Sequence, residues 1–203
     1  MDQLLLGRAD GPVVVTALAG AVGGDYRTSS ENGVRHFRAL GATDVVVAPD
    51  AREDRDTALA ILGTARLLVL PGGSPSRLLD ALNSTGVADL LRDLLTAGGT
   101  VMGSSAGAMV LCDWTVLPDR RGPSGVAVAS GLGIISGMVV VPHWTGERDD
   151  WLRAVPEDVQ VVGLPEESGV MVEDGILTAV GRAPTRLVTA GRDLGVGDSW
   201  RPA

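Results

Sequence analysis

Short runs of Val, Leu and Ile alternate along this chain with helix-like stretches, and this alternation constrains the fold more than any other feature. Runs of strand length lie at residues 12–20, 44–49, 66–73, 99–105, 137–144 and 159–166. Runs that are apolar throughout suit strands buried on both faces, as in a parallel sheet. Between them, residues 29–41, 76–82 and 86–99 carry apolar side chains at helical spacing. We therefore predict an α/β fold with a doubly wound, mostly parallel sheet.

The later part of the chain follows a different pattern. Residues 168–181 hold Asp174-Gly175 between two strand-like runs, which predicts an antiparallel C-terminal hairpin. Residues 115–130 are polar with Pro and Gly, so we expect a connection there. The charged stretch 50–56 is expected to be a solvated loop or a helix start. The 203 residues suit one domain, residues 1–203.

Composition excludes several classes of partner and cofactor. The net charge of −8 opposes binding to the phosphate backbone of nucleic acids. Cys112 is the one cysteine, so no internal disulfide is expected, and no Cys/His cluster indicates a metal site. The N-terminus lacks a signal-peptide pattern, and no apolar run reaches the roughly 18 residues of a membrane span. We expect a cytoplasmic protein with no metal, no organic cofactor and no membrane contact.

The string Gly103-Ser104-Ser105-Ala106-Gly107 matches the G-x-S-x-G pattern of a nucleophile elbow, with Ser105 in the middle. A strand-like run precedes it and a helix-like start follows it, which is the context that an elbow needs. Ser104 would fall one residue before the apex. A glycine-rich turn that packs a helix against a strand fits the same short pattern, so the elbow needs partners elsewhere in the chain.

A serine nucleophile needs a base, and the chain has two histidines. His36 lies in a helix-like stretch beside Arg35 and Arg38 and is expected at the surface. His143 follows an apolar run, at a strand end where ligand sites of parallel sheets gather. We therefore take His143 as the candidate base.

A carboxylate should fix the imidazole of that base. Asp113 and Asp119 lie between the serine and the histidine. Asp113 is expected on the helix after the elbow, pointing away, whereas Asp119 lies in a loop that can fold back over the site. We favour Asp119, and Asp149 and Glu166 stay open.

Four strings together resemble the aspartyl dipeptidase and cyanophycinase family of serine peptidases, within the class I glutamine amidotransferase-like superfamily. They are GSSAGA at 103–108, LPGGSPSRLLDAL at 70–82, GLGIISGMVVVPHW at 131–144 and VVGLPEESGVMVEDG at 161–175. The resemblance implies Ser105 as nucleophile, His143 as base and Asp119 as the acid. It also implies that backbone amides of Gly73 and Ala106 form the oxyanion hole.

The resemblance further implies a small peptide substrate, cleaved by an aspartyl dipeptidase-like exopeptidase. An acidic substrate side chain needs an arginine, for which Arg148 and Arg77 are the candidates. Glutamine amidotransferases of the superfamily carry cysteine at the elbow, so the serine here disfavours glutamine hydrolysis. A homodimer is compatible with this interpretation.

Two alternatives remain open at this point. Where the family has Asn or an Asp-Gln type pair after the glycine turn, this chain has Ser74-Pro75-Ser76. That departure favours a non-catalytic α/β domain that binds a small ligand or a partner. A cyanophycinase-like peptidase is the other alternative, with the same chemistry and a differently shaped pocket.

Overall fold

The computed structural model describes residues 1–120, 125–146 and 150–201. By its internal contacts the chain divides into two compact units, Asp2–Ala108 and Met109–Ala203, the latter joined by Met1. Each unit is described by itself below, and a single domain for the whole chain stays a prediction.

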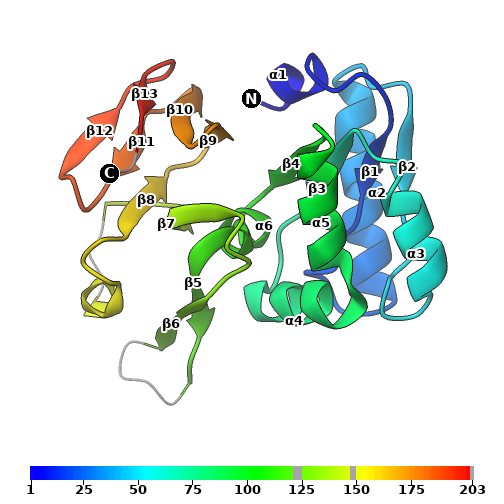
Figure 1. Ribbon diagram of the computed structural model, residues 1–203, viewed down its shortest axis with the longest axis horizontal. Helices are drawn as coiled ribbons and strands as arrows, with labels where there is room; N and C mark the ends of the chain where they lie inside the picture. Colours follow the sequence, from blue (N-terminus) through cyan, green and yellow to red (C-terminus); the bar gives the residue numbers. More distant parts are fainter. Residues whose placement is uncertain (121–124, 147–149, 202–203) are drawn as a thin grey trace. The chain divides into compact units, whose positions relative to one another are not determined.

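The first unit is built on a four-stranded parallel sheet with the order β2-β1-β3-β4 (Figure 1). Its strands are β1 (Val13–Val15), β2 (Val45–Val47), β3 (Leu67–Leu70) and β4 (Thr100–Gly103). Its helices are α1 (Asp2–Leu6), α2 (Gly24–Ala39), α3 (Arg55–Leu62), α4 (Pro75–Thr85) and α5 (Val87–Thr96), and α6 (Ala106–Leu111) begins at its end. The sequence pattern predicts the four strands and the helices α2, α4, α5 and α6. α3 begins within the charged stretch 50–56, and α1 was not predicted.

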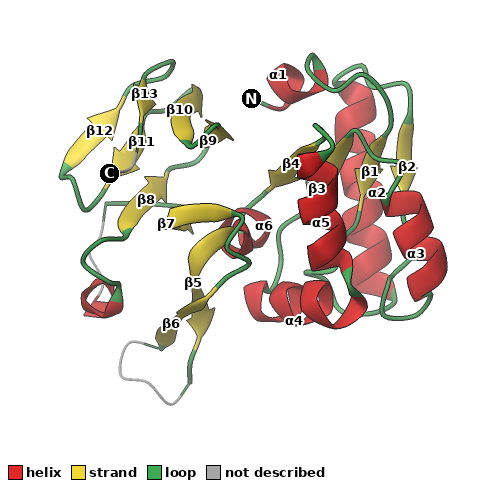
Figure 2. Cartoon of the chain, viewed as in Figure 1, coloured by secondary structure: helices red, strands yellow, loops and turns green. Residues whose placement is uncertain are grey.

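The core of this unit explains why its strands are apolar throughout. Every residue of β1 and β3 is buried, because helices cover the sheet (Figure 2). Val13, Val15, Leu67 and Val69 pack against Phe37 of α2 in one cluster. Burial of both faces removes the polar alternation that a half-exposed strand would show.

The strand order also marks where a ligand site belongs in this unit. β1 connects to β2 on one side of the sheet, whereas β3 and β4 lie on the other side of β1. Ligands of parallel α/β sheets bind at such a reversal, beyond the carboxyl ends of the strands. The loops that follow β1, β3 and β4 are therefore the expected site, and the last of them carries Ser105.

The second unit holds a six-stranded sheet, β12-β11-β8-β7-β5-β6, and a three-stranded sheet, β13-β10-β9. The larger sheet is parallel over β5, β7 and β8, and its remaining pairs are antiparallel. The elements are β5 (Cys112–Pro118), β6 (Val126–Ser130), β7 (Ile135–Pro142), the 3-10 helix η1 (Asp150–Ala154), β8 (Gln160–Leu164), β9 (Ser168–Glu173), β10 (Ile176–Gly181), β11 (Thr185–Leu187), β12 (Arg192–Leu194) and β13 (Ser199–Trp200). Parallel strands and helices in one chain confirm the mixed α/β class, and β9 with β10 confirms the predicted hairpin.

The prediction of a connection at residues 115–130 was wrong. β5 and β6 form an antiparallel pair there, with Val116 opposite Val128. Trp114, Val116, Val126 and Val128 pack on the apolar cluster of this unit, which explains why the segment is a hairpin. Pro118 is the last residue of β5, and Gly125 directly precedes β6. Within the described residues, no helix has both the length and the apolar character to cross a membrane.

Candidate active site

Ser105 occupies the turn between β4 and α6 with a strained backbone. Its φ is +50°, a left-handed conformation that side chains rarely adopt. The amide of Ser104 donates to the carbonyl of Leu70 (3.0 Å), and that of Gly107 donates to the carbonyl of Ser104 (2.9 Å). Such strain costs on the order of 1–3 kcal/mol and persists where the surroundings enforce it. The turn therefore has the geometry of an elbow with Ser105 at its apex.

The two glycines of the motif are required by close packing. A Cβ atom on Gly103 would lie 2.4 Å from the carbonyl carbon of Gly107. A Cβ atom on Gly107 would lie 2.2 Å from the carbonyl oxygen of Leu70. The first turn of α6 can therefore approach β3 and β4 this closely only without side chains at both positions.

The Gly72-Gly73 turn after β3 runs directly past the serine. A Cβ atom on Gly72 would lie 3.2 Å from Cβ and 3.7 Å from Oγ of Ser105. Gly73 has a φ of +146°, and a Cβ atom there would lie 2.8 Å from the carbonyl oxygen of Ala19. The turn is thus packed between the elbow and the loop that follows β1. Its oxyanion-hole role remains a prediction, as does that of Ala106.

Ser74-Pro75, where the chain departs from the family pattern, is a well-formed helix start. The Ser74 side chain accepts a hydrogen bond from the amide of Arg77 (3.3 Å), and Pro75 is the first residue of α4. Proline is favoured at that position because its missing N–H would have no helical partner. Ser74 and Pro75 are therefore explained by the start of α4, and their presence does not imply a loss of catalysis.

Of the two candidate substrate-binding arginines, the structure describes the contacts of Arg77 alone. Arg77 donates from Nη1 to the carbonyl of Ala19 (2.9 Å), so its guanidinium braces the loop after β1. Arg148 lies outside the described residues. Substrate binding by either remains a prediction.

A buried ion pair holds the same loop from its other side. Arg52 donates to both carboxylate oxygens of Asp50 (2.8 and 2.7 Å) and to the carbonyl oxygens of Leu18 (3.3 Å) and Gly20 (3.0 Å). The hydrogen bonds that Arg52 donates to the Asp50 carboxylate raise the pKa of Arg52. Asp50 is only 6% exposed. The expected helix start in stretch 50–56 is confirmed, because α3 begins at Arg55, but Asp50 itself is not solvated. A charge run does not reveal which carboxylate turns inward.

His143 and Glu166 meet at one edge of the sheet in the second unit. They follow β7 and β8, which pair in parallel with Pro142 opposite Leu164, so the residues beyond both strand ends are neighbours. Nδ1 of His143 lies 2.5 Å from Oε1 of Glu166. His143 also has a left-handed backbone, with φ +56°. A carboxylate at Nδ1 favours the tautomer with its proton there, which puts the basic lone pair on Nε2.

The carboxylate at Nδ1 of His143 is thus Glu166, whereas the sequence favoured Asp119. Asp119 lies in the β5–β6 turn, where its amide donates to the carbonyl of Gly125 (2.8 Å). Glu166 stayed open because the sequence does not show which acid beyond a strand end contacts His143. Its position directly after Pro165, just past an apolar run, was the available signal.

The remaining candidate acids were Asp113 and Asp149. Asp113 does not lie on a helix, because α6 ends at Leu111 and β5 begins at Cys112. Its Oδ2 accepts a hydrogen bond from the amide of Gly137 (2.6 Å), at a register shift between β5 and β7. Asp149 lies outside the described residues.

Cys112 and His36 have positions unsuited to catalysis. Cys112 is fully buried, and this burial raises the pKa of its thiol to about 12. A thiol with that pKa provides almost no thiolate nucleophile at neutral pH. His36 lies on α2 with Nε2 2.7 Å from Oδ2 of Asp2, at the protein surface as expected.

The sequence profile of Peptidase family S51 matches residues 17–180, which is most of the chain and includes Ser105, His143 and Glu166. The chain belongs to Peptidase family S51. Membership places it among the serine-type peptidases, a class of hydrolases. The predicted resemblance to the dipeptidase and cyanophycinase family is confirmed at this level.

Two curated relatives show how far the similarity of this S51 chain extends. Peptidase E from Nostoc sp. is 26% identical over 186 residues, covering 85% of this chain and 74% of that protein. A cyanophycinase from Synechococcus elongatus is 30% identical over 169 residues, covering 75% of this chain and 51% of that protein. The chain therefore spans about half the length of the cyanophycinase.

Two solved structures share the fold. A peptidase from an acI-B1 actinobacterium superposes with a TM-score of 0.77 at 21% identity, over 98% of this chain and 89% of that one. A protein described as a putative peptidase E from Listeria monocytogenes EGD-e gives a TM-score of 0.62 at 16% identity, over 89% and 93%. At these identities, the likeness supports the fold alone.

Proposed function

We propose that this S51 chain cleaves small peptides, as a dipeptidase-like exopeptidase with Ser105 as its nucleophile. The observation that carries the proposal is the left-handed backbone of Ser105 on the turn between β4 and α6. A serine held in this strained conformation projects its hydroxyl from the turn, where a substrate carbonyl can reach it. The nearby Gly72-Gly73 turn supplies a second segment of backbone beside the same side chain.

His143 is the proposed base, and Glu166 is the carboxylate that orients it. The 2.5 Å contact at Nδ1 supports the assignment of Glu166 in place of Asp119. Nε2 then accepts the proton from the Ser105 hydroxyl, and the carboxylate stabilises the imidazolium that results. Catalysis requires Oγ of Ser105 and Nε2 of His143 to come within hydrogen-bond reach, about 3 Å.

The reaction proceeds in two halves. Oγ of Ser105 attacks the scissile carbonyl carbon while its proton passes to His143, and the amides of Gly73 and Ala106 donate to the oxyanion. His143 returns that proton to the leaving amine as the C–N bond breaks, which leaves an acyl-enzyme ester on Ser105. Water then attacks the ester, with His143 again as base, and releases the carboxylic acid product.

Hydrolysis of a dipeptide and tripeptide panel by the full chain tests this function. We expect turnover that Ser105→Ala and His143→Ala each lower by at least 1,000-fold, because nucleophile and base act as a unit. Ser104→Ala is the matched control, since it removes a neighbouring hydroxyl one residue from the apex, and it should keep most activity. Equal loss in the Ser104 and Ser105 variants, or no turnover of any peptide, would count against the proposal.

A further inference from the structure

A pocket of about 400 Å³ lies within the second unit. Two of its lining residues, Trp144 and Pro165, are the chain neighbours of His143 and Glu166. Its volume is within the range of small-ligand sites, roughly 300–1,000 Å³. A group bound there would therefore contact the residues that directly adjoin the proposed base and its carboxylate in the chain.

Trp144 forms a fixed aromatic part of the pocket wall. Its amide donates to the carbonyl of Leu164 (3.0 Å), which ties the residue to the end of β8. The indole lies directly against Gly163, where a Cβ atom would be 2.5 Å from its Cγ. Since the backbone of Gly163 supports the ring, the indole is placed before a ligand arrives.

The wall also has an apolar part, beside the polar residues Thr145, Arg186 and Asp193. Pro165, Pro184 and Val188 line it, and the two prolines have no backbone N–H to offer a ligand. Aromatic rings pack well against such surfaces and against another aromatic ring.

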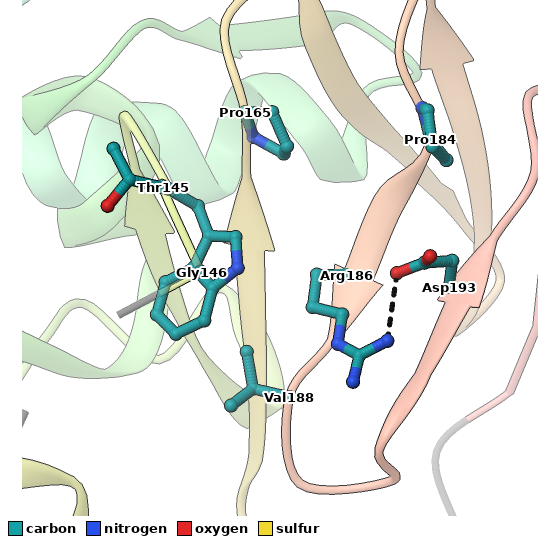
Figure 3. Close-up of a pocket in the computed structure, with 8 residues that line it drawn as sticks. Thr145, Gly146, Pro165, Pro184, Arg186, Val188 and Asp193 are labelled. Carbon is teal, nitrogen blue, oxygen red and sulfur yellow. Dashed lines mark hydrogen bonds and ion pairs between the residues drawn. The ribbon is translucent and has the colours of Figure 1, made fainter. Parts of the chain in front are cut away.

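The charged side chains of the wall neutralise each other. Arg186 on β11 and Asp193 on β12 are directly opposite in the antiparallel pair, and Nη1 of Arg186 lies 3.0 Å from Oδ1 of Asp193 (Figure 3). An acidic ligand would have to compete with Asp193 for the guanidinium. The paired guanidinium stays planar and can stack on an aromatic ring.

From this wall we propose that the pocket binds an uncharged aromatic side chain of the peptide substrate, in a residue that flanks the scissile bond. The inference rests on the proposed function, because that function makes the ligand a peptide and places the reaction at His143. It also predicts that an aspartyl side chain is not the preferred occupant of this pocket.

Calorimetric binding to the full-length Ser105→Ala protein tests the pocket without turnover. The probes are the tripeptides Ala-Phe-Ala, Ala-Ala-Ala and Ala-Asp-Ala with free termini, as an exopeptidase requires. We expect the Phe peptide to bind at least tenfold more tightly than the other two. In the added Trp144→Ala variant that preference should fall to threefold or less, whereas Trp200→Ala, on β13 of the other sheet, should keep it.

A second variant keeps the test decisive if Trp144→Ala fails to fold. Asp193 is largely exposed, and Asp193→Asn removes the negative charge that pairs with Arg186, so affinity for the Asp peptide should rise at least threefold.

Tightest binding of the Asp peptide to the Ser105→Ala protein, no measurable binding of the Phe peptide, or unchanged selectivity in the variants would overturn the proposal. Trp144-dependent binding without turnover by the native protein would contradict the proposed function alone, and Ser105-dependent turnover without that binding would contradict the pocket alone.

Discussion

Nδ1 of His143 lies 2.5 Å from Oε1 of Glu166, and the two residues lie one and two positions beyond the ends of the parallel strands β7 and β8. The pairing of β7 with β8 therefore brings base and carboxylate together from residues 23 positions apart in sequence. Both side chains are more than half exposed, so the contact is fixed by the strand ends and not by burial. This arrangement supports Glu166 as the residue that orients the proposed base.

Glu166→Gln should lower kcat by about 100-fold or more, with a smaller effect on KM. The amide cannot stabilise an imidazolium as a carboxylate does, and it does not enforce the same tautomer. Steady-state kinetics on the best peptide of the panel would measure this. Asp119→Asn should change kcat less than threefold, and the reverse ranking of the two variants would restore Asp119 as the acid.

The side-chain contact that separates Glu166 from Asp119 is not encoded locally. The sequence predicts that His143 ends a strand, because an apolar run leads into it. The strand before Asp119, β5, and the strand before Glu166, β8, both pair in parallel with β7, so strand order alone does not choose between the two acids. The choice depends on where each side chain lies beyond its strand end, which packing of the folded chain decides. The elbow was easier to predict, because all of its residues lie within five positions of the chain.

Gly73→Ala should reduce both stability and turnover. Its φ of +146° and the 2.8 Å approach to the Ala19 carbonyl leave no room for a methyl group, so the turn beside Ser105 must shift. We expect a loss of about 1–3 kcal/mol in the free energy of unfolding, with a clear fall in kcat. Urea denaturation and kinetics on the same preparation measure the two effects.

Gly98→Ala is the matched control for that variant. Gly98 also has a positive φ (+82°), but a Cβ atom there would meet nothing within 4 Å. It should therefore cost only the left-handed strain of about 1–2 kcal/mol and leave kcat unchanged. A Gly73→Ala enzyme with normal kcat would remove the Gly73 amide from the proposed oxyanion hole.

Asp50→Asn should destabilise the first unit and loosen the loop after β1. Asp50 is 3% exposed at its side chain and pairs with Arg52, so its neutralisation leaves a largely buried guanidinium without a charge partner. The expected loss is about 3 kcal/mol in the free energy of unfolding. Asp89→Asn, which breaks an exposed pair with Arg92, should cost less than about 0.5 kcal/mol. Similar losses in both variants would show that the buried pair does not hold the loop.

Cys112 should make the native protein less stable in alkali. Its pKa is about 12 in the folded chain and 9.0 for the ordinary thiol, so between these values the unfolded chain has lost a proton that the folded chain keeps. Stability therefore falls as pH rises above 9, by about 1.4 kcal/mol at pH 10 for this group. Urea denaturation at pH 8 and pH 10 should show this extra loss in the native protein and not in Cys112→Ala. Parallel pH dependence in the two proteins would contradict the burial of the thiol.

Two local features misled the sequence-based prediction for physical reasons that the structure makes plain. Pro and Gly in 115–130 suggested an irregular connection, but β5 and β6 pair there and their valines pack on one cluster. Asp50 begins a charged run, yet it is buried because it pairs with Arg52, which also donates to the carbonyls of Leu18 and Gly20. In both cases the deciding contacts include residues far away in the chain.

Intact-mass labelling with a fluorophosphonate tests the central claim, that Ser105 is an activated nucleophile, most directly. The native protein and Ser104→Ala should each gain one adduct, and peptide mapping should place it on Ser105. Ser105→Ala should gain none, and His143→Ala should react at least 100-fold more slowly because the base is missing. A folded native protein that gains no adduct, or a Ser105→Ala protein labelled as fast as the native one, would contradict the account.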